Sequence, residues 1–307
     1  MKISPYKRFE KALKRAYLKP LTVIRYGSLK PDRAKLCGSP HWIYIDPEDP
    51  CAIKKVVEEP LRGKVSDNLR FWRDFIPHLQ PTLVVDVGLN YGECLFGSDY
   101  PLNTRLFGFE ANPRLIPHLE RSRSEHPAGD RMTIANCLVS DEAAEDLPFL
   151  VNPDWSGSSS ALKELNDRPQ SIEFKLPART LDSMVPAELS AGATLLFKMD
   201  IEGYESRALK GFVETFSQAR TAIGFIEFDG QYIRWAGQDP DDYLKWLHEH
   251  FLTYRVSSWK RKELVEIRRF SDLPKLHGDP SRVHTDLVLV SKSTTGGWLA
   301  PAWTIHP

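Results

Sequence analysis

The chain has few cysteines, and none of them are paired in sequence. Only 4 of its 307 residues are cysteine, and no two form a C-x-x-C pair. Disulfide frameworks need many cysteines, and zinc sites need closely spaced cysteine or histidine ligands. We therefore expect free thiols in a reducing compartment rather than a disulfide frame or a zinc site. The four are Cys37, Cys51, Cys94 and Cys137.

The chain also lacks an excess of charge and a long apolar run near its start. Lys and Arg together number 41, Asp and Glu also number 41, and the formal net charge is +0. Proteins that bind nucleic acid normally show a basic excess or stripe, so we expect no nucleic-acid partner. Residues 1–20 hold many Lys and Arg but no continuous apolar stretch, which predicts neither a signal peptide nor a membrane span. These absences favour a cytoplasmic protein.

Residues 84–92 are the most informative segment, and they read Val-Val-Asp-Val-Gly-Leu-Asn-Tyr-Gly. An apolar run reaches Asp86, and Gly88 and Gly92 follow at four-residue spacing. This order predicts a buried strand, a glycine turn and a helix, so that backbone N–H groups can approach a ligand where no Cβ intrudes. Two alternatives stay open: an ordinary strand–turn–helix with structural glycines, and an Asp86 that only caps the helix.

A second acidic residue indicates which nucleotide-like ligand binds. Residues 104–110 read as a short strand that ends in Glu110, 24 positions after Asp86. An acid at the tip of the second strand of a βαβ unit accepts hydrogen bonds from ribose hydroxyls. The third glycine of a dinucleotide site is missing, because Asn90 and Tyr91 stand between the two glycines. The pattern therefore favours S-adenosylmethionine (SAM), which has no phosphate to cradle.

Residues 195–205 add a third motif, Leu-Leu-Phe-Lys-Met-Asp-Ile-Glu-Gly-Tyr-Glu. Together with residues 84–92, Phe-Glu-Ala-Asn-Pro at 109–113, Thr-Leu-Asp at 180–182 and the Ser-rich residues 156–162, it resembles the FkbM-type SAM-dependent methyltransferases. The resemblance covers roughly residues 40–290, and the Lys-x-Asp-x-Glu-Gly-x-Glu segment is its most specific part. Leu89 departs from the family, which usually has a small residue there, and we expect it to crowd the loop without removing a ligand group.

The resemblance implies a Rossmann-like α/β fold of the class I SAM-methyltransferase type, with a doubly wound, mostly parallel seven-stranded sheet. We divide the chain into an N-terminal cap (1–80), a methyltransferase domain (81–292) with a substrate-wall insertion (140–190), and a C-terminal tail (293–307). The alternation of apolar runs and helical patterns supports this division. Strands are predicted near 83–87, 105–110, 131–137, 194–200, 221–228, 253–259 and 284–291, the last one antiparallel.

Helices are predicted near 65–79, 113–125, 203–217 and 240–251, and a short one after Gly92. Residues 41–46 read as a strand followed by a turn. Residues 5–18 read as a basic amphipathic helix, either docked on the domain or serving as an arm that binds a glycan or a partner.

The cofactor residues follow from the rule that open α/β sheets bind ligands at the carboxyl ends of their strands. Backbone groups of residues 88–92 are expected to hold the methionine part of SAM, and Glu110 the ribose. The adenine is expected between residues 111–112 and 136–140, while Asp200 stabilises the cationic sulfonium. The predicted cofactor contacts are Asp86, Gly88, Asn90, Tyr91, Gly92, Glu110, Ala111, Asn112, Cys137 and Asp200.

A methyl acceptor with a hydroxyl group must lose a proton, so a base is expected beside well-positioned reactants. Asp200 and Glu202 lie two apart at a strand end and should face the same way, and Glu227 ends the next strand. Clustered acids raise one another's pKa. We rank Glu227 and Glu202 ahead of Asp200, with Lys198 and His284 as further candidates. Alternatively, the carboxylates bind Mg²⁺, which the resemblance does not require.

Aromatic and hydroxyl side chains indicate where the acceptor binds. The Ser-rich loop holds Trp155, Ser158 and Ser159, and Tyr232 and Trp235 follow Glu227. Aromatic faces beside polar groups suit a sugar or a hydroxylated natural product. A second interpretation, in which Tyr232 and Trp235 pack against the sheet edge, stays open. A nucleobase acceptor is less attractive, because the loop at 199–203 lacks the Pro-Pro-aromatic arrangement that grips a flipped base.

The sequence therefore predicts a SAM-dependent O-methyltransferase for a hydroxyl of a sugar, glycan or polyketide-like metabolite. N-methylation of a small amine is a second hypothesis. A catalytically silent methyltransferase-like domain that binds a partner is a third, and the joint presence of Asp86, Gly88, Gly92, Glu110 and Asp200 argues against it.

Overall fold

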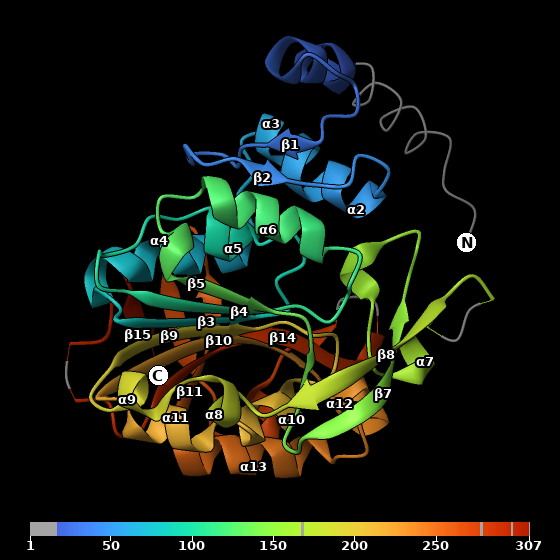
Figure 1. The fold of residues 1–307 in the computed structure, drawn as a ribbon. Helices are drawn as coiled ribbons and strands as arrows, with labels where there is room; N and C mark the ends of the chain where they lie inside the picture. Colours follow the sequence, from blue (N-terminus) through green and yellow to red (C-terminus); the bar gives the residue numbers. More distant parts are fainter. Residues whose placement is uncertain (1–16, 167–168, 277–278, 296, 307) are drawn as a thin grey trace.

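The structure, a computed structural model, describes residues 17–166, 169–276, 279–295 and 297–306. Most of the helix predicted over residues 5–18 lies outside the described residues, although residues 17–26 are helical. The main element is a mixed β-sheet with helices on both faces, as in Rossmann-like folds (Figure 1).

Ten strands of the described residues form the main sheet, in the order β15-β12-β11-β14-β10-β9-β3-β4-β5, with β13 paired to β14. The strands β3, β4, β5, β9 and β10 are parallel, and β14 runs antiparallel between β10 and β11. The predicted antiparallel last strand is therefore confirmed. The strands are β3 (Leu83–Val87), β4 (Arg105–Phe109), β5 (Met132–Ala135), β9 (Thr194–Met199), β10 (Thr221–Asp229), β11 (Phe251–Ser258), β12 (Glu263–Glu266), β13 (Lys275–Leu276), β14 (Asp279–Ser291) and β15 (Thr304–His306).

The expected seven strands are too few, because β12, β13 and β15 enlarge the sheet. For β15, the reason lies in the segment that we predicted as a tail. It carries two tryptophans, and Trp303 is buried against Phe71 and Phe75, while Trp298 packs on Phe75 and Tyr254. Burying such large apolar rings brings β15 alongside β12.

Alternation along the strands builds two cores, one on each face of the sheet. Val84, Leu196 and Phe225 point to one face, whereas Val85 and Phe197 point to the other. Strands that are buried on both faces read as continuous apolar runs, which is why the sequence located them well.

Helices cover the two faces unequally. Figure 1 shows α4 (Asp67–Leu79), α5 (Glu93–Phe96) and α6 (Ile116–Glu125) on one side of the sheet. The opposite side carries α8 (Leu181–Met184), α9 (Ala187–Ser190), α10 (Glu205–Lys210), α11 (Val213–Gln218) and α13 (Pro240–His250), while α12 (Gly230–Trp235) follows β10. The helix predicted at 203–217 is thus two short helices that separate at Gly211 and Phe212.

The N-terminal segment, the described residues 17–80 that precede β3, lies over α6. Its buried apolar side chains belong to the same core as those of the sheet face that α4 covers. It contains the short antiparallel pair β1 (Arg33–Ala34) and β2 (Ile43–Tyr44). The strand predicted at 41–46 is present as the shorter β2, whereas β1 was not predicted. The turn expected after it is wrong beyond residue 49. Residues 50–61 are helical, as α2 (Pro50–Ala52), a π-helical stretch (Ile53–Glu58) and α3 (Glu59–Leu61), because Asp49 caps the start and Val56 and Val57 are buried.

The predicted insertion forms a small sheet of its own at one end of the molecule (Figure 1). The strands of this sheet are β6 (Leu138–Val139), which lies just before the insertion, and β7 (Ala144–Val151) and β8 (Ile172–Arg179) within it, with α7 (Lys163–Asn166) between β7 and β8. Both strand-like runs found in the sequence, at 147–151 and 172–176, lie in these strands. Residues 181–190 instead pack beneath the main sheet as α8 and α9.

Candidate active site

A row of ionisable side chains lies on one face of the main sheet, at the carboxyl ends of its parallel strands. Asp86 on β3 is the register partner of Lys198 on β9. On β10, Glu227 and Asp229 continue the row of Ile223 and Phe225, which face α4. Because side chains alternate along a strand, all of these groups share the α4 face. The sheet therefore gathers charge where open α/β folds bind ligands.

These strand ends border a cavity of about 420 Å³. Its wall also includes residues of the N-terminal segment and of the insertion. The predicted site residues that line it are Asp86, Gly88, Asn90, Glu110, Ala111, Cys137, Trp155, Ser159, Lys198, Asp200, Glu202 and Glu227. These predicted residues come from six separate segments of the chain and meet in one space.

Other predicted residues do not line this cavity. The Tyr91 hydroxyl donates to Asp49 at 2.9 Å, and Tyr91 and Asn112 border a neighbouring hollow of about 140 Å³. Gly92 has φ +75° and lies against Phe96 of α5. The remaining predicted residues outside the cavity wall are Ser158, Tyr232, Trp235 and His284.

The glycine turn after β3 is packed against the motif at the end of β9. Gly88 has φ +78°, and a Cβ there would lie 2.0 Å from the carbonyl oxygen of Asp200. A side chain at this position is excluded by the protein itself. The crowding expected from Leu89 is avoided, because its side chain is buried over Gly108 of β4, where a Cβ would lie 2.7 Å from Leu89 Cδ1.

Glu110 follows β4, and its carboxylate fixes the turn. Its Oε2 accepts the Asn90 N–H and its Oε1 accepts the Asn112 N–H, both at 2.7 Å. Burial raises the pKa of Glu110 to about 7, although the two backbone donors oppose the shift. Each carboxylate oxygen keeps a second lone pair, so Glu110 can also accept bonds from a ligand in the cavity.

Asp86 and Lys198 form a buried ion pair beneath the turn. Lys198 Nζ lies 3.2 Å from Asp86 Oδ1 and donates to the Gly88 carbonyl at 2.9 Å. Burial disfavours the charge on Lys198, but Asp86 and Asp200 outweigh it and raise the pKa of the lysine. Lys198 therefore stays protonated and holds the turn to β9, so it is not available as a base.

The far end of the cavity is apolar. Ala111, Leu138 and Phe149 line it and belong to the small core of the insertion. Cys137 is buried beside them, and burial raises the pKa of its thiol to about 11. The four cysteines are free thiols. A neutral thiol among apolar side chains suits a flat aromatic ligand.

The loop after β9 is held by Glu205, whose role the sequence did not reveal. Its Oε1 accepts the Ile201 N–H at 2.8 Å and its Oε2 accepts the Gly203 N–H at 3.0 Å. Glu205 stands in the first turn of α10, but its carboxylate binds the amides of the preceding loop. The loop presents Glu202 to the cavity with φ +52°, a left-handed conformation that few non-glycine residues adopt.

Glu227 differs from the other acids of the site in having a buried carboxylate oxygen without a hydrogen-bond partner among the described residues. That oxygen is Oε2, and Oε1 lies 3.7 Å from His284 Nδ1. Burial, followed by the charges of Asp200 and Glu205, raises the pKa of Glu227 well above its ordinary value. Asp286 stands opposite Glu227 in register, and burial with the charge of Asp200 raises its pKa to about 7. Such a cluster exchanges protons near neutral pH.

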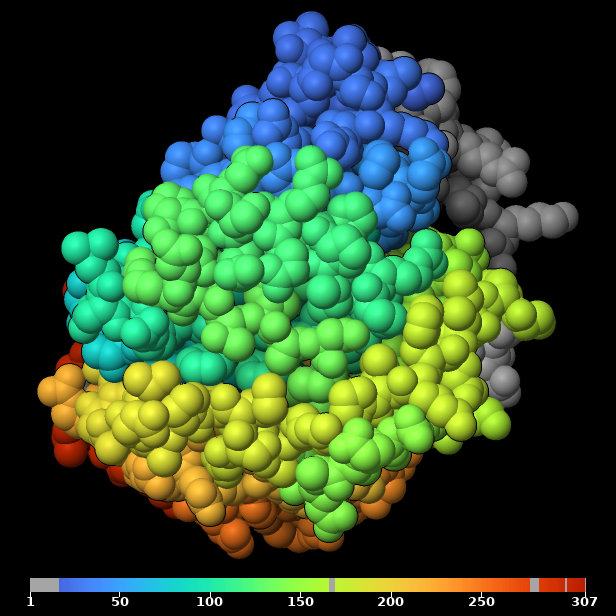
Figure 2. All heavy atoms as spheres, viewed as in Figure 1, coloured from blue at the N-terminus to red at the C-terminus, as the bar shows by residue number. Residues whose placement is uncertain are grey.

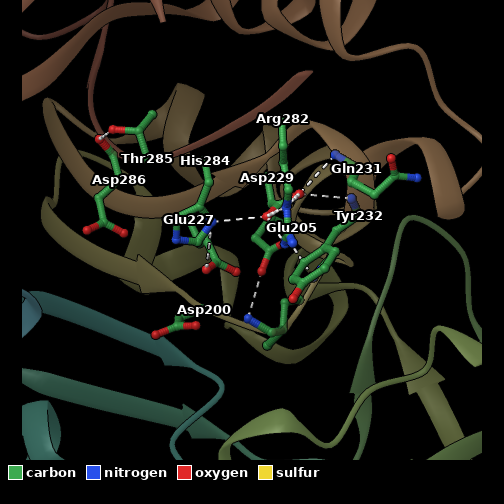
Figure 3. A network of polar contacts seen from close by, with 12 residues as sticks. Asp200, Glu205, Glu227, Asp229, Gln231, Tyr232, Arg282, His284, Thr285 and Asp286 are labelled. Atoms are coloured by element: carbon green, nitrogen blue, oxygen red, sulfur yellow. Dashed lines mark hydrogen bonds and ion pairs between the residues drawn. The ribbon is translucent and has the colours of Figure 1, made fainter. Parts of the chain in front are cut away.

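A polar network beside Glu227 fixes the neighbouring groups (Figure 3). Asp229 accepts bonds from Arg282 Nε at 2.9 Å and from His284 Nδ1 at 3.0 Å, and it caps α12. Burial opposes its charge, but these donors hold the pKa of Asp229 at about 2. Figure 3 shows His284 between Asp229 and Glu227, and its side chain is 39% exposed. The network thus connects the cavity wall with solvent.

Tyr232 and Trp235 belong to this network rather than to the cavity wall. Arg282 lies over the Tyr232 ring at 4.8 Å, and Trp235 stacks on the same ring. Tyr232 also packs on Gly203, where a Cβ would lie 2.8 Å from Tyr232 Cβ. Their place supports the alternative in which they pack against the protein.

The N-terminal segment supplies residues that the sequence did not indicate. Ser66 caps α4, and Asn68 in its first turn donates to Asp200 Oδ2 at 3.1 Å; both line the cavity. At the rim, Lys54 Nζ lies 4.9 Å from the ring centroid of Trp155. The sequence indicates only the N-cap at Ser66. The contacts of Asn68 with Asp200 and of Lys54 with Trp155 join segments more than 90 positions apart, so no local pattern predicts them.

A metal-binding cluster and a membrane-spanning helix are both absent from the described residues. No group of three or more His, Cys, Asp or Glu residues is arranged to hold a metal ion, within the part of the chain that the structure covers. Likewise, no helix among the described residues is long and apolar enough to cross a bilayer.

Comparison with known families gives a direct match. The model of the methyltransferase FkbM domain matches residues 86–256, which is more than half of the chain. The chain belongs to the FkbM methyltransferase family. The match begins at Asp86 and spans the glycine turn, Glu110, the 198–205 motif and Glu227. It confirms the resemblance inferred from the sequence.

Solved structures with related folds are more distant. A methyltransferase FkbM from Methylobacillus flagellatus is 18% identical, with a TM-score of 0.39; the match covers 68% of this chain and 44% of that one. An O-methyltransferase from Bacillus cereus, solved with SAH, is 10% identical, with a TM-score of 0.38 and coverage of 74% and 82%. The O-methyltransferase TomG from Streptomyces achromogenes, solved with SAM, is 12% identical, with a TM-score of 0.38 and coverage of 76% and 82%. A comparison with curated proteins found no match.

Proposed function

We propose that this FkbM-family protein is a SAM-dependent O-methyltransferase that acts on a hydroxyl of a sugar, glycan or polyketide-like metabolite. The observation that carries the proposal is the buried, unpartnered Glu227 Oε2 at the acidic end of a cavity whose other end is apolar. Methyl transfer to an alcohol needs a base that can take the hydroxyl proton, and a carboxylate oxygen without a hydrogen-bond partner is available for this. The apolar end of the same cavity suits the adenine ring of the methyl donor.

The residues present fit SAM at each part of the cavity. The apolar end formed by Ala111, Leu138 and Phe149 suits the adenine, and Glu110 can accept the ribose hydroxyls. The turn at Gly88 and Asn90 suits the methionine part. Asp200, which Asn68 orients, provides a negative charge for a cationic sulfur. When bound, SAM supplies an electrophilic methyl group on that cationic sulfur.

Glu227 is assigned as the base that removes the acceptor proton. Asp200 is the strongest of the nearby charges that raise its pKa. Burial is the larger cause of the raised pKa, and a positive charge beside Asp200 would oppose only the contribution of Asp200, which shifts Glu227 towards the ionised form that accepts a proton. His284 donates its Nδ1–H to Asp229, which raises the pKa of the imidazole, and the charged ring 3.7 Å from Glu227 Oε1 favours the ionised form of Glu227.

The acceptor space lies on the polar side of the cavity. Ser66, Asn68, Tyr204 and Glu202 line it together with Glu227. Hydroxyl, amide and carboxylate groups around one aromatic ring suit a polyhydroxylated molecule. Trp155 at the rim offers a second ring. This set replaces the Tyr232 and Trp235 pair that the sequence had indicated.

The function is tested by methyl transfer from isotopically labelled SAM to a panel of sugars and hydroxylated polyketides, with amine analogues of each. Transfer to oxygen, detected by mass spectrometry and NMR, is the expected result. Transfer to the amines alone would favour the N-methylation hypothesis. If SAM binds but no compound in the panel is methylated, the O-methyltransferase proposal in its present form is refuted.

The ribose assignment predicts a pH dependence of SAM affinity. A carboxylate with a pKa of about 7 is mostly ionised at pH 8 and mostly protonated at pH 6. Since ribose hydroxyls donate to the ionised form, affinity should fall about tenfold from pH 8 to pH 6. Glu110→Gln should bind SAM about 10–100 times more weakly, because a charge-assisted bond is worth about 1.5–3 kcal/mol.

Calorimetric titrations at both pH values check this prediction. Glu205→Gln is the matched control, because burial also raises the pKa of Glu205 to about 7 but its carboxylate binds loop amides. The pH dependence should vanish in Glu110→Gln and persist in Glu205→Gln. The opposite pattern would show that Glu205, and not Glu110, is the carboxylate whose protonation weakens SAM binding.

A further inference from the structure

The helix over residues 17–26, here called the N-terminal helix, is apolar on two sides. One side is docked: Leu18 and Thr22 are buried, and the Tyr26 ring meets Trp42 edge to face. Figure 1 shows this helix beyond β1 and β2, at the end of the molecule farthest from the main sheet. Figure 2 shows the same N-terminal region as a projecting lobe.

The other side of the N-terminal helix is apolar and exposed. Tyr17 is 67% exposed, Val23 42% and Ile24 81%, and Leu29 just after the helix is 53% exposed. Tyr17 and Ile24 lie seven positions apart and therefore share a face. Among the described residues, four of the nine large apolar side chains that are exposed belong to this stretch of 13 residues. A helix that is apolar on opposite sides normally has both sides covered.

Charge around this face has one sign. The first 35 residues contain 11 of the 41 Lys and Arg residues but only 2 of the 41 Asp and Glu residues. On the helix itself, Lys19 and Arg25 are exposed and make no ion pair with a described carboxylate. Lys30 pairs with Glu48. The described part of the helix thus carries two exposed positive charges, on Lys19 and Arg25, that no described carboxylate neutralises.

This charge decides between possible occupants of the face. A second copy of the chain would bring two basic surfaces together, and residues 1–16 carry six Lys and Arg against one Glu. A second copy of the chain and the segment 1–16 would therefore each bring positive charge close to Lys19 and Arg25, and this repulsion opposes association. An anionic surface that also accepts apolar side chains has the complementary character. Lys and Arg beside exposed apolar residues are the composition of helices that lie in the headgroup region of acidic bilayers.

We infer that the N-terminal helix docks the protein onto an anionic membrane surface, with Tyr17, Val23 and Ile24 inserted at the headgroup level and Lys19 and Arg25 against acidic lipids. This peripheral binding is independent of the proposed methyl transfer. It concerns an end of the molecule that contributes no residue to the cavity.

Flotation of the full chain with lipid vesicles tests the inference. The protein should float with vesicles of phosphatidylcholine and phosphatidylglycerol and remain at the bottom with phosphatidylcholine alone. Binding should weaken as salt is raised, because the contribution of Lys19 and Arg25 is screened. Failure to bind the anionic vesicles at low salt would overturn the inference.

Two substitutions locate the contact. Ile24→Asp should reduce the fraction of protein bound to anionic vesicles at least ~10-fold, since it replaces an inserted apolar group with a negative charge. Leu102→Asp is the matched control, because Leu102 is 91% exposed in the connection before β4, and it should bind like the parent. Equal binding by both variants contradicts the inference. So does light scattering that shows a dimer without lipid which Ile24→Asp dissociates.

Discussion

Replacing Glu227 with Gln should lower turnover by about 10²–10⁴, while the dissociation constant for SAM changes by no more than a few fold. Gln keeps the size of the side chain but cannot accept a proton. The buried Oε2 of Glu227 has no partner among the described residues, so little structure depends on it. The residual activity of the variant measures what positioning alone contributes.

The dependence of turnover on pH is a second test of Glu227 as the base. A base must be deprotonated to act, so the activity of the parent should fall as pH decreases through the raised pKa of Glu227. The Glu227→Gln variant should not show this fall in activity at low pH. Glu249→Gln, an exposed glutamate on α13, is the control and should match the parent. Turnover of Glu227→Gln within a few fold of the parent would remove Glu227 as the base.

Replacing Gly88 with Ala should abolish measurable SAM binding, with a loss of at least ~100-fold in affinity. The added Cβ would lie 2.0 Å from the Asp200 carbonyl oxygen and 2.8 Å from Ile201 Cγ2. The turn and the 200–203 loop must then move apart, which displaces both Asn90 and Asp200. We first expected Gly88 to make room for the ligand, but the structure shows that it makes room for the protein itself.

Gly237→Ala separates the clash from backbone strain. Gly237 has φ +79°, almost the same as Gly88 at φ +78°, but a Cβ there meets nothing within 4 Å. Both variants should lose about 1–2 kcal/mol of stability from the left-handed conformation. Only Gly88→Ala should lose SAM binding. Tight binding by a folded Gly88→Ala protein would place the ligand away from this turn.

The sequence predicted the elements whose signals are local. The apolar run before Gly88 and the motif at 198–205 located β3, β9 and the turns that follow them, because strands buried on both faces must be continuously apolar. The rule that open α/β sheets bind ligands at the carboxyl ends of their strands then grouped Asp86, Asp200 and Glu227. These local patterns brought most of the predicted acids into one cavity.

The sequence could not predict groups that reach the site through long-range packing. Asn68 contacts Asp200, 132 positions away, and no pattern around Asn68 distinguishes it from a solvent-facing helix residue. Tyr232 and Trp235 show the reverse case. Their position after β10 fitted a substrate wall as well as packing against the sheet edge. In the structure Arg282 lies over the Tyr232 ring, Trp235 stacks on the same ring, and Tyr232 Cβ lies close to Gly203.

Glu205 shows a similar limit. An acid in the first turn of a helix usually interacts with the helix dipole. Here the preceding loop folds back, so that Ile201 and Gly203 present their N–H groups to the carboxylate. A left-handed residue at Glu202 makes this possible, and the sequence gives no sign of it except the following glycine.

Calorimetric titration of the protein with SAM tests the central claim most directly. The account predicts one binding site per chain, competition by S-adenosylhomocysteine, and weaker binding at pH 6 than at pH 8 that depends on Glu110. A protein that is folded by its thermal transition, yet shows neither binding heat nor a thermal shift with SAM, would contradict it.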